Sequence, residues 1–178
     1  RTLENRLKER GANLRTDIDL LNLAWEDRPS LPVQPLYEHV APWASVGRVQ
    51  KLAQLRETLQ QRHADAHFIA TLDDIAWLFN LRGSDVSFNP VFLSFALIEQ
   101  RQASLFVDLN KVSPELRSTL QRDGVTLRDY RDIAAALAAL PESTRLLLDP
   151  ARVTCGLIAN VHKGVTLVEG INPTTLAK

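Results

Sequence analysis

Residues 66–108 read AHFIATLDDIAWLFNLRGSDVSFNPVFLSFALIEQRQASLFVD, and this stretch decides the fold class. Its first residues, 66–71, form a short apolar run that predicts a β-strand. Thr71 then stands at a helix N-cap position, with Asp74 three residues later as its capping-box partner. Residues 73–79 are nearly all apolar, so they predict a short helix that is buried on most of its surface.

A hairpin follows the helix. The segment 80–90 is polar and contains glycine and proline, which is typical of a loop. Residues 91–98 form a long apolar strand, and a tight turn near residue 100 leads into a second strand at residues 104–108. Two such runs joined by a short turn predict a β-hairpin.

Helices and strands alternate on both sides of this stretch. Upstream, Ser45 is an N-cap for an amphipathic helix that ends near His63. Downstream, the pattern predicts a helix opened by Ser113, a strand at 125–127, a helix at 132–140, a strand at 145–149, a helix from 150 to about 161 and a strand at 165–168. Alternating elements with one inserted hairpin predict an α/β fold in which helices flank a mixed β-sheet.

The composition excludes several classes of protein. The chain has 178 residues, of which 45% are hydrophobic and 24% charged, which is typical of a globular domain and excludes wholesale disorder. Lys plus Arg equals Asp plus Glu at 21 each, so no basic excess indicates a nucleic-acid partner. No run of about 18 uncharged apolar residues predicts a membrane span. The single cysteine, Cys155, excludes an internal disulfide, and we expect it to be buried in a helix.

Both ends of the sequence indicate a piece of a longer protein. No methionine is present, even at position 1. The segment 28–35 is rich in proline and lacks periodicity, which favours a domain boundary there. We therefore assign residues 1–28 to the end of a preceding domain and 29–171 to the α/β domain. Residues 172–178, with Asn172 as N-cap and Pro173 at the first helical position, start a connecting helix.

The usual catalytic motifs are missing. His63 and His67 are four residues apart, but a helix-to-strand break falls between them, so they are not expected to share a metal ion. His39 and His162 are isolated and are expected at the surface. The sequence has no nucleophile elbow, no Walker loop and no dinucleotide-binding glycine motif. It therefore predicts no metal centre and no cofactor site within these residues.

The loop after residue 80 is the remaining candidate site. It concentrates Arg82, Gly83, Ser84, Asp85 and Asn89 directly after a buried helix, and loops at the ends of rigid elements often carry binding residues. We expect an ion pair between Arg82 and Asp85, with Gly83 permitting a sharp turn. An Asx-type turn with a local ion pair and no binding role is an alternative.

The same loop carries a family resemblance. Residues 71–86, TLDDIAWLFNLRGSDV, and 89–92, NPVF, closely resemble a signature in the second, creatinase-N-like domain of the three-domain Xaa-Pro aminopeptidases. Residues 25–29, WEDRP, resemble the junction between their first and second domains, and 169–173, EGINP, the exit from the second. Departures are minor, such as Asp74 where glutamate is common.

The resemblance implies a parent enzyme that removes an N-terminal residue preceding proline. In that family a third, pita-bread domain holds a binuclear manganese site built from two aspartates, one histidine and two glutamates, and none of these ligands can be matched here. It therefore implies a non-catalytic domain, inactive alone, whose partners are its own catalytic domain and a peptide with proline in second position. Arg82, Gly83, Ser84, Asp85 and Asn89 become candidates for the substrate cleft or a domain interface.

The resemblance also favours the cytoplasm, and it leaves a homodimeric parent open. Two alternatives remain at this point, which are a stand-alone binding or scaffold domain and a catalytically dead relative. The coding sequence beyond Lys178 distinguishes them from an active peptidase, because the catalytic domain either carries its metal ligands or does not.

Overall fold

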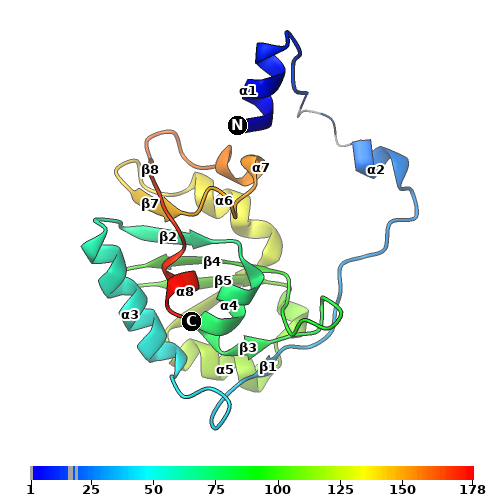
Figure 1. Ribbon diagram of the computed structural model, residues 1–178. Helices are drawn as coiled ribbons and strands as arrows, with labels where there is room; N and C mark the ends of the chain where they lie inside the picture. Colours follow the sequence, from blue (N-terminus) through cyan, green and yellow to red (C-terminus); the bar gives the residue numbers. More distant parts are fainter. Residues whose placement is uncertain (1, 16–17, 19) are drawn as a thin grey trace. The chain divides into compact units, whose positions relative to one another are not determined.

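The computed structural model of the chain describes residues 2–15, 18 and 20–178 (Figure 1). The chain divides into two compact units, Arg1–Pro32 and Val33–Lys178. The first unit contains helices α1 (Thr2–Glu9) and α2 (Leu20–Ala24). The spacing of Leu3 and Leu7 and the run over 19–25 predict two short helices, which α1 and α2 confirm within the described residues; residue 19 lies outside them. The division into 1–28, 29–171 and 172–178 remains a proposal.

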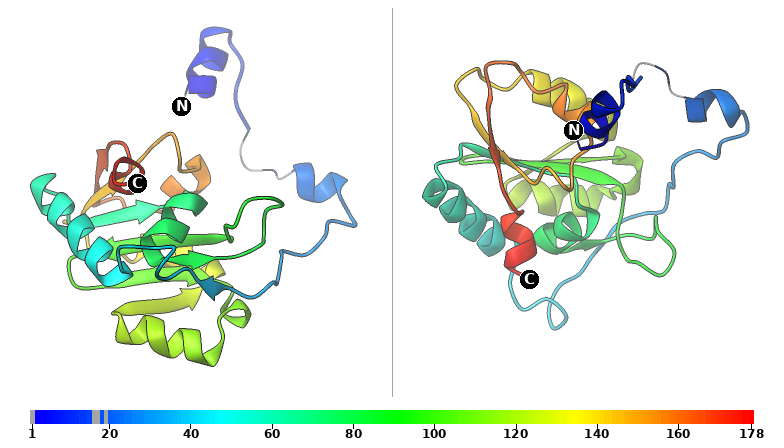
Figure 2. Two further views of the ribbon diagram at one scale, coloured as in Figure 1. Left: turned by 60° about the horizontal axis from the view of Figure 1, so that its bottom comes forward. Right: turned by 45° about the horizontal axis from the view of Figure 1, so that its top comes forward.

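The second unit is built on a six-stranded mixed sheet (Figures 1 and 2). Its strand order is β6-β5-β4-β2-β7-β8, in which β4 runs antiparallel to both β2 and β5 and the remaining neighbours are parallel. The strands are β2 (Ala66–Ile69), β4 (Ser94–Glu99), β5 (Ala103–Val107), β6 (Val125–Asp129), β7 (Arg145–Leu148) and β8 (Thr166–Glu169). This arrangement confirms the predicted mixed sheet and the β4–β5 hairpin.

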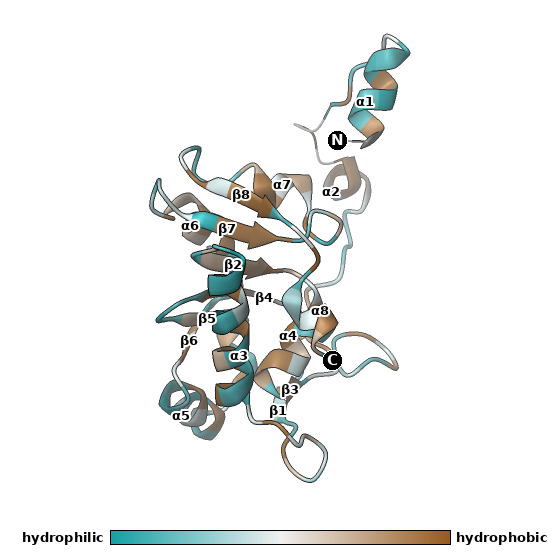
Figure 3. Ribbon diagram, turned by 60° about the vertical axis from the view of Figure 1, so that its left-hand side comes forward, coloured by the Kyte–Doolittle hydropathy of each residue, from teal (hydrophilic) through white to brown (hydrophobic). Residues whose placement is uncertain are grey.

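Helices pack on both faces of the sheet. Successive side chains of the central strands point to opposite faces, so each of these strands contributes to both core layers. In β4, Ala96 and Ile98 join one core cluster, while Leu97 joins the other. The first face packs against α3 (Arg48–Gln61), α4 (Leu72–Phe79) and α5 (Pro114–Arg122), and the second against α6 (Ile133–Ala138) and α7 (Cys155–Ile158). In Figure 3, which is coloured by hydropathy, β7 and α4 are apolar and α5 is largely polar.

Short elements complete the domain. Strand β1 (Tyr37–Glu38) pairs antiparallel with β3 (Leu81–Arg82), a pairing that the sequence analysis missed. Two single turns of 3-10 helix, η1 (Leu109–Lys111) and η2 (Tyr130–Asp132), follow β5 and β6. The last helix, α8 (Pro173–Leu176), packs against α3 and α4. Among the helices of the described residues, none combines the length and apolar character that crossing a bilayer requires.

Three local predictions were wrong. Helix α3 begins at Arg48 with Gly47 at its N-cap position, two residues later than Ser45 predicts. The predicted helix over 150–161 shortens to α7, because Asp149 and the residues after it form a turn that precedes a new N-cap at Thr154. As a result Cys155, at the first position of α7, is exposed rather than buried.

The capping box at α4 was also wrong. Thr71 does occupy the N-cap position, but its hydroxyl makes no cap hydrogen bond. Instead Asn172 donates from Nδ2 to Thr71 Oγ1 at 3.0 Å and to Asp74 Oδ2 at 3.1 Å. The hydroxyl of Thr175 also donates to Asp74 Oδ2, at 2.8 Å. Polar groups about a hundred residues away in sequence thus take the place of the local cap, and they hold α8 against the start of α4.

Candidate functional site

The candidate loop starts at the end of a buried helix. Asn80 ends α4 in the left-handed conformation, with φ 51°, which turns the chain sharply into β3. The backbone N–H of His39 donates to the Asn80 carbonyl at 2.8 Å, next to the β1–β3 pairing. The loop therefore emerges from a position that is fixed by both a helix and a strand pair.

Arg82 does not pair with Asp85. Its Nη1 donates to the carbonyls of Ala76 at 2.8 Å and Leu81 at 2.9 Å. The carbonyls at the C-terminal end of a helix carry partial negative charge and attract a cation, so Arg82 turns back onto the end of α4. The predicted ion pair was therefore wrong, because a nearby helix end competes with the carboxylate.

Asp85 instead turns inward to Lys111, the last residue of η1. The two side chains form a buried ion pair, with 0% of the Asp85 side chain and 1% of the Lys111 side chain exposed. Asp85 Oδ2 also accepts a hydrogen bond from the Leu93 backbone at 2.7 Å, and the Lys111 carbonyl accepts one from Leu36 at 2.9 Å. This pair therefore ties the loop to the segments before β1 and β4.

Gly83 is fixed by close packing rather than by an unusual φ angle. A Cβ atom at this position would lie 2.8 Å from the Cβ of Phe92 and 3.2 Å from both Leu36 Cδ2 and the Val91 carbonyl oxygen. Real Cβ atoms do not approach a neighbour that closely, so the loop can pass over Phe92 only because residue 83 has no side chain.

The tip of the loop faces outward. Ser84 and Asn89 are exposed, and an isolated β-bridge between Val86 and Asn89 closes the tip. Phe88, at the turn, is fully exposed and has φ 62°, which is unusual for an aromatic residue. The five predicted residues therefore separate, with Gly83 and Asp85 packed inward, Arg82 half-buried, and Ser84 and Asn89 on the surface.

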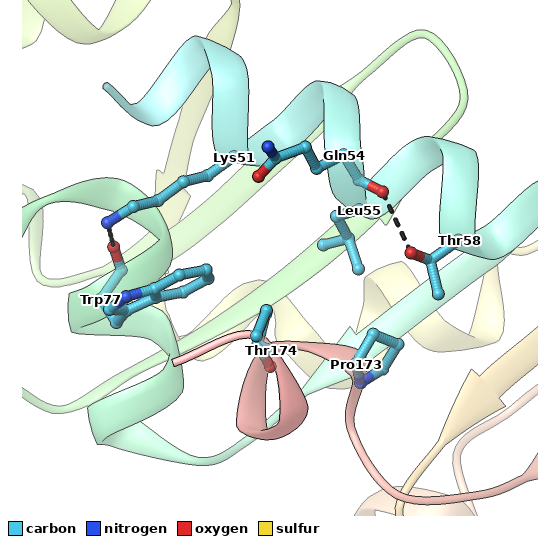
Figure 4. Close-up of a pocket in the computed structure, with 8 residues that line it drawn as sticks. Lys51, Gln54, Leu55, Thr58, Trp77, Pro173 and Thr174 are labelled. Carbon is cyan, nitrogen blue, oxygen red and sulfur yellow. Dashed lines mark hydrogen bonds between the residues drawn. The ribbon is translucent and has the colours of Figure 1, made fainter. Parts of the chain in front are cut away.

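Lys51 lies beside this loop and was not singled out from the sequence. Its Nζ donates to the Trp77 carbonyl at 2.7 Å (Figure 4) and lies 4.2 Å from the centroid of the Trp77 ring. It also donates to Asn80 Oδ1 at 2.6 Å. Burial and the neighbouring Arg82 charge lower the pKa of Lys51 to about 8. A lysine at a helical position carries no sequence signal for such an environment.

The histidines do not form a site. His67 is fully buried in β2, where its Nδ1 lies 3.0 Å from the Leu147 carbonyl oxygen, while His63 is exposed. Burial lowers the pKa of His67 to about 4. Both His39 and His162, expected at the surface, are half-buried. Within the part of the chain that the structure describes, no three His, Cys, Asp or Glu side chains gather as a possible metal site.

Comparison with known proteins places the chain in a family. The sequence model for the Creatinase/Prolidase N-terminal domain matches residues 27–178. The chain is 39% identical over 147 residues to a probable Xaa-Pro aminopeptidase P of Aspergillus niger, covering 82% of this chain and 24% of that protein. A relative of the same description from Sordaria macrospora is 35% identical over 143 residues, covering 80% and 23% respectively. The chain thus spans about a quarter of the length of the curated relatives it matches.

Solved structures agree on the fold. An X-prolyl aminopeptidase from Caenorhabditis elegans, described as a cytosolic enzyme with a di-nuclear active site, superposes with a TM-score of 0.88 at 23% identity. That match covers 99% of this chain and 30% of the worm protein. A second match, to aminopeptidase P from Streptococcus thermophilus, has a TM-score of 0.51 at 15% identity and covers 72% of this chain.

The mixed sheet with helices on both faces is therefore the α/β domain found at the N-terminal side of creatinase- and prolidase-type enzymes. The chain belongs to the Creatinase/Prolidase N-terminal domain family. The relatives quoted above are named as Xaa-Pro aminopeptidases, which confirms the resemblance inferred from residues 71–92.

Proposed function

We propose that this chain is the non-catalytic domain of a metal-dependent Xaa-Pro aminopeptidase, a hydrolase that releases the N-terminal residue preceding proline. In this proposal the loop 82–89 borders the path of the peptide into the active site. The family match and the names of the relatives support the parent activity. The share of those relatives that the chain covers supports a catalytic centre carried by other residues.

The observation that carries the proposed role is the combination of a rigid base and an exposed tip. Asp85, Lys111 and Gly83 fix the base of the loop by a buried ion pair and close packing. Ser84 and Asn89 then present polar groups to the surroundings from a backbone that cannot shift freely. A loop that only connected two strands would not need a buried charge pair beneath it, whose desolvation costs free energy.

The same proposal covers the metal centre of the parent enzyme and the cellular compartment in which it acts. The di-nuclear site of the worm enzyme supports a two-metal centre in the parent, and the resemblance favours manganese. We place its ligands outside this chain, so the 178 residues alone are expected to be inactive and no step of hydrolysis is assigned to them. The worm enzyme's description as cytosolic supports a cytoplasmic location, with the peptide and the catalytic domain as partners.

Kinetics of the longer polypeptide test the role of the loop. Ser84→Ala and Asn89→Ala are expected to change kcat/KM for long Xaa-Pro peptides while leaving dipeptide kinetics and metal content unchanged, because only longer substrates reach the loop. Arg82→Ala and Asp85→Ala, which loosen the base, are expected to alter the same length dependence. Arg101→Gln, an exposed change at the β4–β5 turn, is the control. Equal kinetics for every peptide length in all four variants would reject the cleft role.

Phe88 favours a second role for the same loop, the bracing of a domain interface. A fully exposed phenylalanine at a loop tip costs solvation free energy unless another surface covers it. Phe88→Ser in the longer polypeptide would then lower its thermal stability without changing kinetics at low temperature.

For a stand-alone binding domain or a catalytically dead relative, the coding sequence after Lys178 would carry no metal ligands.

A further inference from the structure

A hollow of about 280 Å³ lies between the start of α3, the end of α4 and β3. Its lining combines basic and aromatic side chains and contains no carboxylate. The side chains that matter below are His39, Trp43, Lys51, Trp77, Asn80 and Arg82. The hollow lies at the base of the candidate loop, but its residues are distinct from the exposed tip of that loop.

The walls of the hollow are held in place before any ligand binds. Asn80, which is 5% exposed, accepts a hydrogen bond from Lys51 and donates from Nδ2 to the Val46 carbonyl at 2.9 Å. It thereby links the segment before α3 to the end of α4. Lys51 is 6% exposed and is pinned against the Trp77 ring. Binding would therefore cost little ordering of these side chains.

The two cations of the hollow, Lys51 and Arg82, can still bind an anion. Nη1 of Arg82 donates to two carbonyls, whereas its Nε and Nη2 form no hydrogen bond or ion pair with the residues that the structure describes. Lys51 donates only to neutral oxygens, so its charge has no counterion there. The nearby carboxylate of Glu38 is already paired with Arg48. Two partly desolvated cations without a counterion favour an anion strongly, because their field is weakly screened.

We propose that this hollow binds a small organic carboxylate, with the carboxylate facing Lys51 and Arg82 and a flat apolar body against Trp43 and Trp77. The planar guanidinium of Arg82 can donate two parallel hydrogen bonds to the two oxygens of a carboxylate. Trp43 lines the hollow and is 78% exposed, so an apolar ligand body packed against it would cover it. The ligand is either a free carboxylate or the C-terminus of a short peptide. This inference is independent of the peptidase role, which would survive its failure.

Titration of the 15N-labelled 178-residue chain tests the proposal. Benzoate represents a free carboxylate and N-acetylphenylalanine a peptide C-terminus, and benzamide and N-acetylphenylalanine amide are their uncharged controls. We expect at least one of the two carboxylates to shift the indole N–H signals of Trp43 and Trp77 saturably, in the millimolar range, with Trp25 unchanged and neither amide effective. The acid that binds more tightly identifies the source of the ligand.

Variants then locate the site. Arg82→Gln and, separately, Lys51→Gln are each expected to weaken binding about tenfold, the usual effect of losing one charged hydrogen-bond donor. Arg101→Gln removes an exposed arginine that lines a different surface hollow and is expected to change affinity less than twofold. The proposal is overturned if neither acid gives saturable shifts, if the amides bind equally well, or if both Arg82→Gln and Lys51→Gln fold and retain full affinity.

Discussion

Lys111→Met removes the cation that neutralises Asp85 beneath the candidate loop. The methionine side chain fills nearly the same volume, so the main change is electrostatic. Because both side chains of the pair are at most 1% exposed, the Asp85 carboxylate is left buried without a counterion and keeps only its hydrogen bond from the Leu93 backbone. Breaking a buried pair in this way typically costs about 3–5 kcal/mol. That is a large part of the stability of a domain of this size.

The double variant Asp85→Asn/Lys111→Met separates the charge from the packing. It leaves no buried charge, and the amide oxygen of asparagine can still accept the Leu93 N–H hydrogen bond. We therefore expect it to be more stable than Lys111→Met alone, with a loss of only about 1–2 kcal/mol relative to the parent chain. The two single changes would then be strongly non-additive.

Urea unfolding followed by tryptophan fluorescence measures these values. The matched control is Asp132→Asn, which breaks the exposed pair with Arg128 at 3.9 Å and is expected to cost under about 1 kcal/mol. The reasoning is refuted if Lys111→Met loses no more than this control, or if the double variant loses the sum of the two single changes.

Three further predictions concern other parts of the domain. Gly83→Ala places a Cβ atom 2.8 Å from Phe92 and is expected to cost about 1–3 kcal/mol in urea unfolding, whereas Gly156→Ala, which meets nothing within 4 Å, is expected to be nearly neutral. The pKa of His67 is about 4 in the folded chain and 6.5 unfolded, so its contribution to stability is complete above pH 6.5 and is lost as the pH falls towards 4. The expected loss of folding stability is about 3 kcal/mol. In a His67→Gln chain, this part of the pH dependence of stability is expected to be absent. Asp74→Ala removes the acceptor of the Thr175 hydroxyl and one of the two acceptors of the Asn172 amide. Hydrogen exchange in α8 is therefore expected to accelerate much more than after Asp73→Ala, and equal rates would contradict the anchoring role.

The fold was largely predictable because its signals are local. The apolar runs over 91–98 and 104–108, separated by a short turn, indicate the β4–β5 hairpin without any knowledge of distant contacts. The same is true of α4, whose residues are nearly all apolar and whose burial was confirmed. The two-residue pairing of β1 with β3 has no such pattern, since strands of this length show no alternation.

The candidate site was less predictable, because its partners are distant in sequence. Asp85 pairs with Lys111, and Thr71 with Asn172, rather than with the neighbours that the local pattern favours. Polar side chains have several acceptable partners, and the fold decides which of them lies closest. The sequence therefore singled out the loop, whose binding role stays a prediction, but assigned its contacts wrongly.

The most direct test of the account measures release of the N-terminal residue from an Xaa-Pro peptide. The assay compares the complete polypeptide encoded by the gene with residues 1–178 alone, both loaded with manganese. We expect activity for the complete polypeptide, loss of that activity on chelation, and none for the 178 residues. Hydrolysis by the 178 residues alone, or a folded and metal-loaded complete polypeptide without activity, would contradict it.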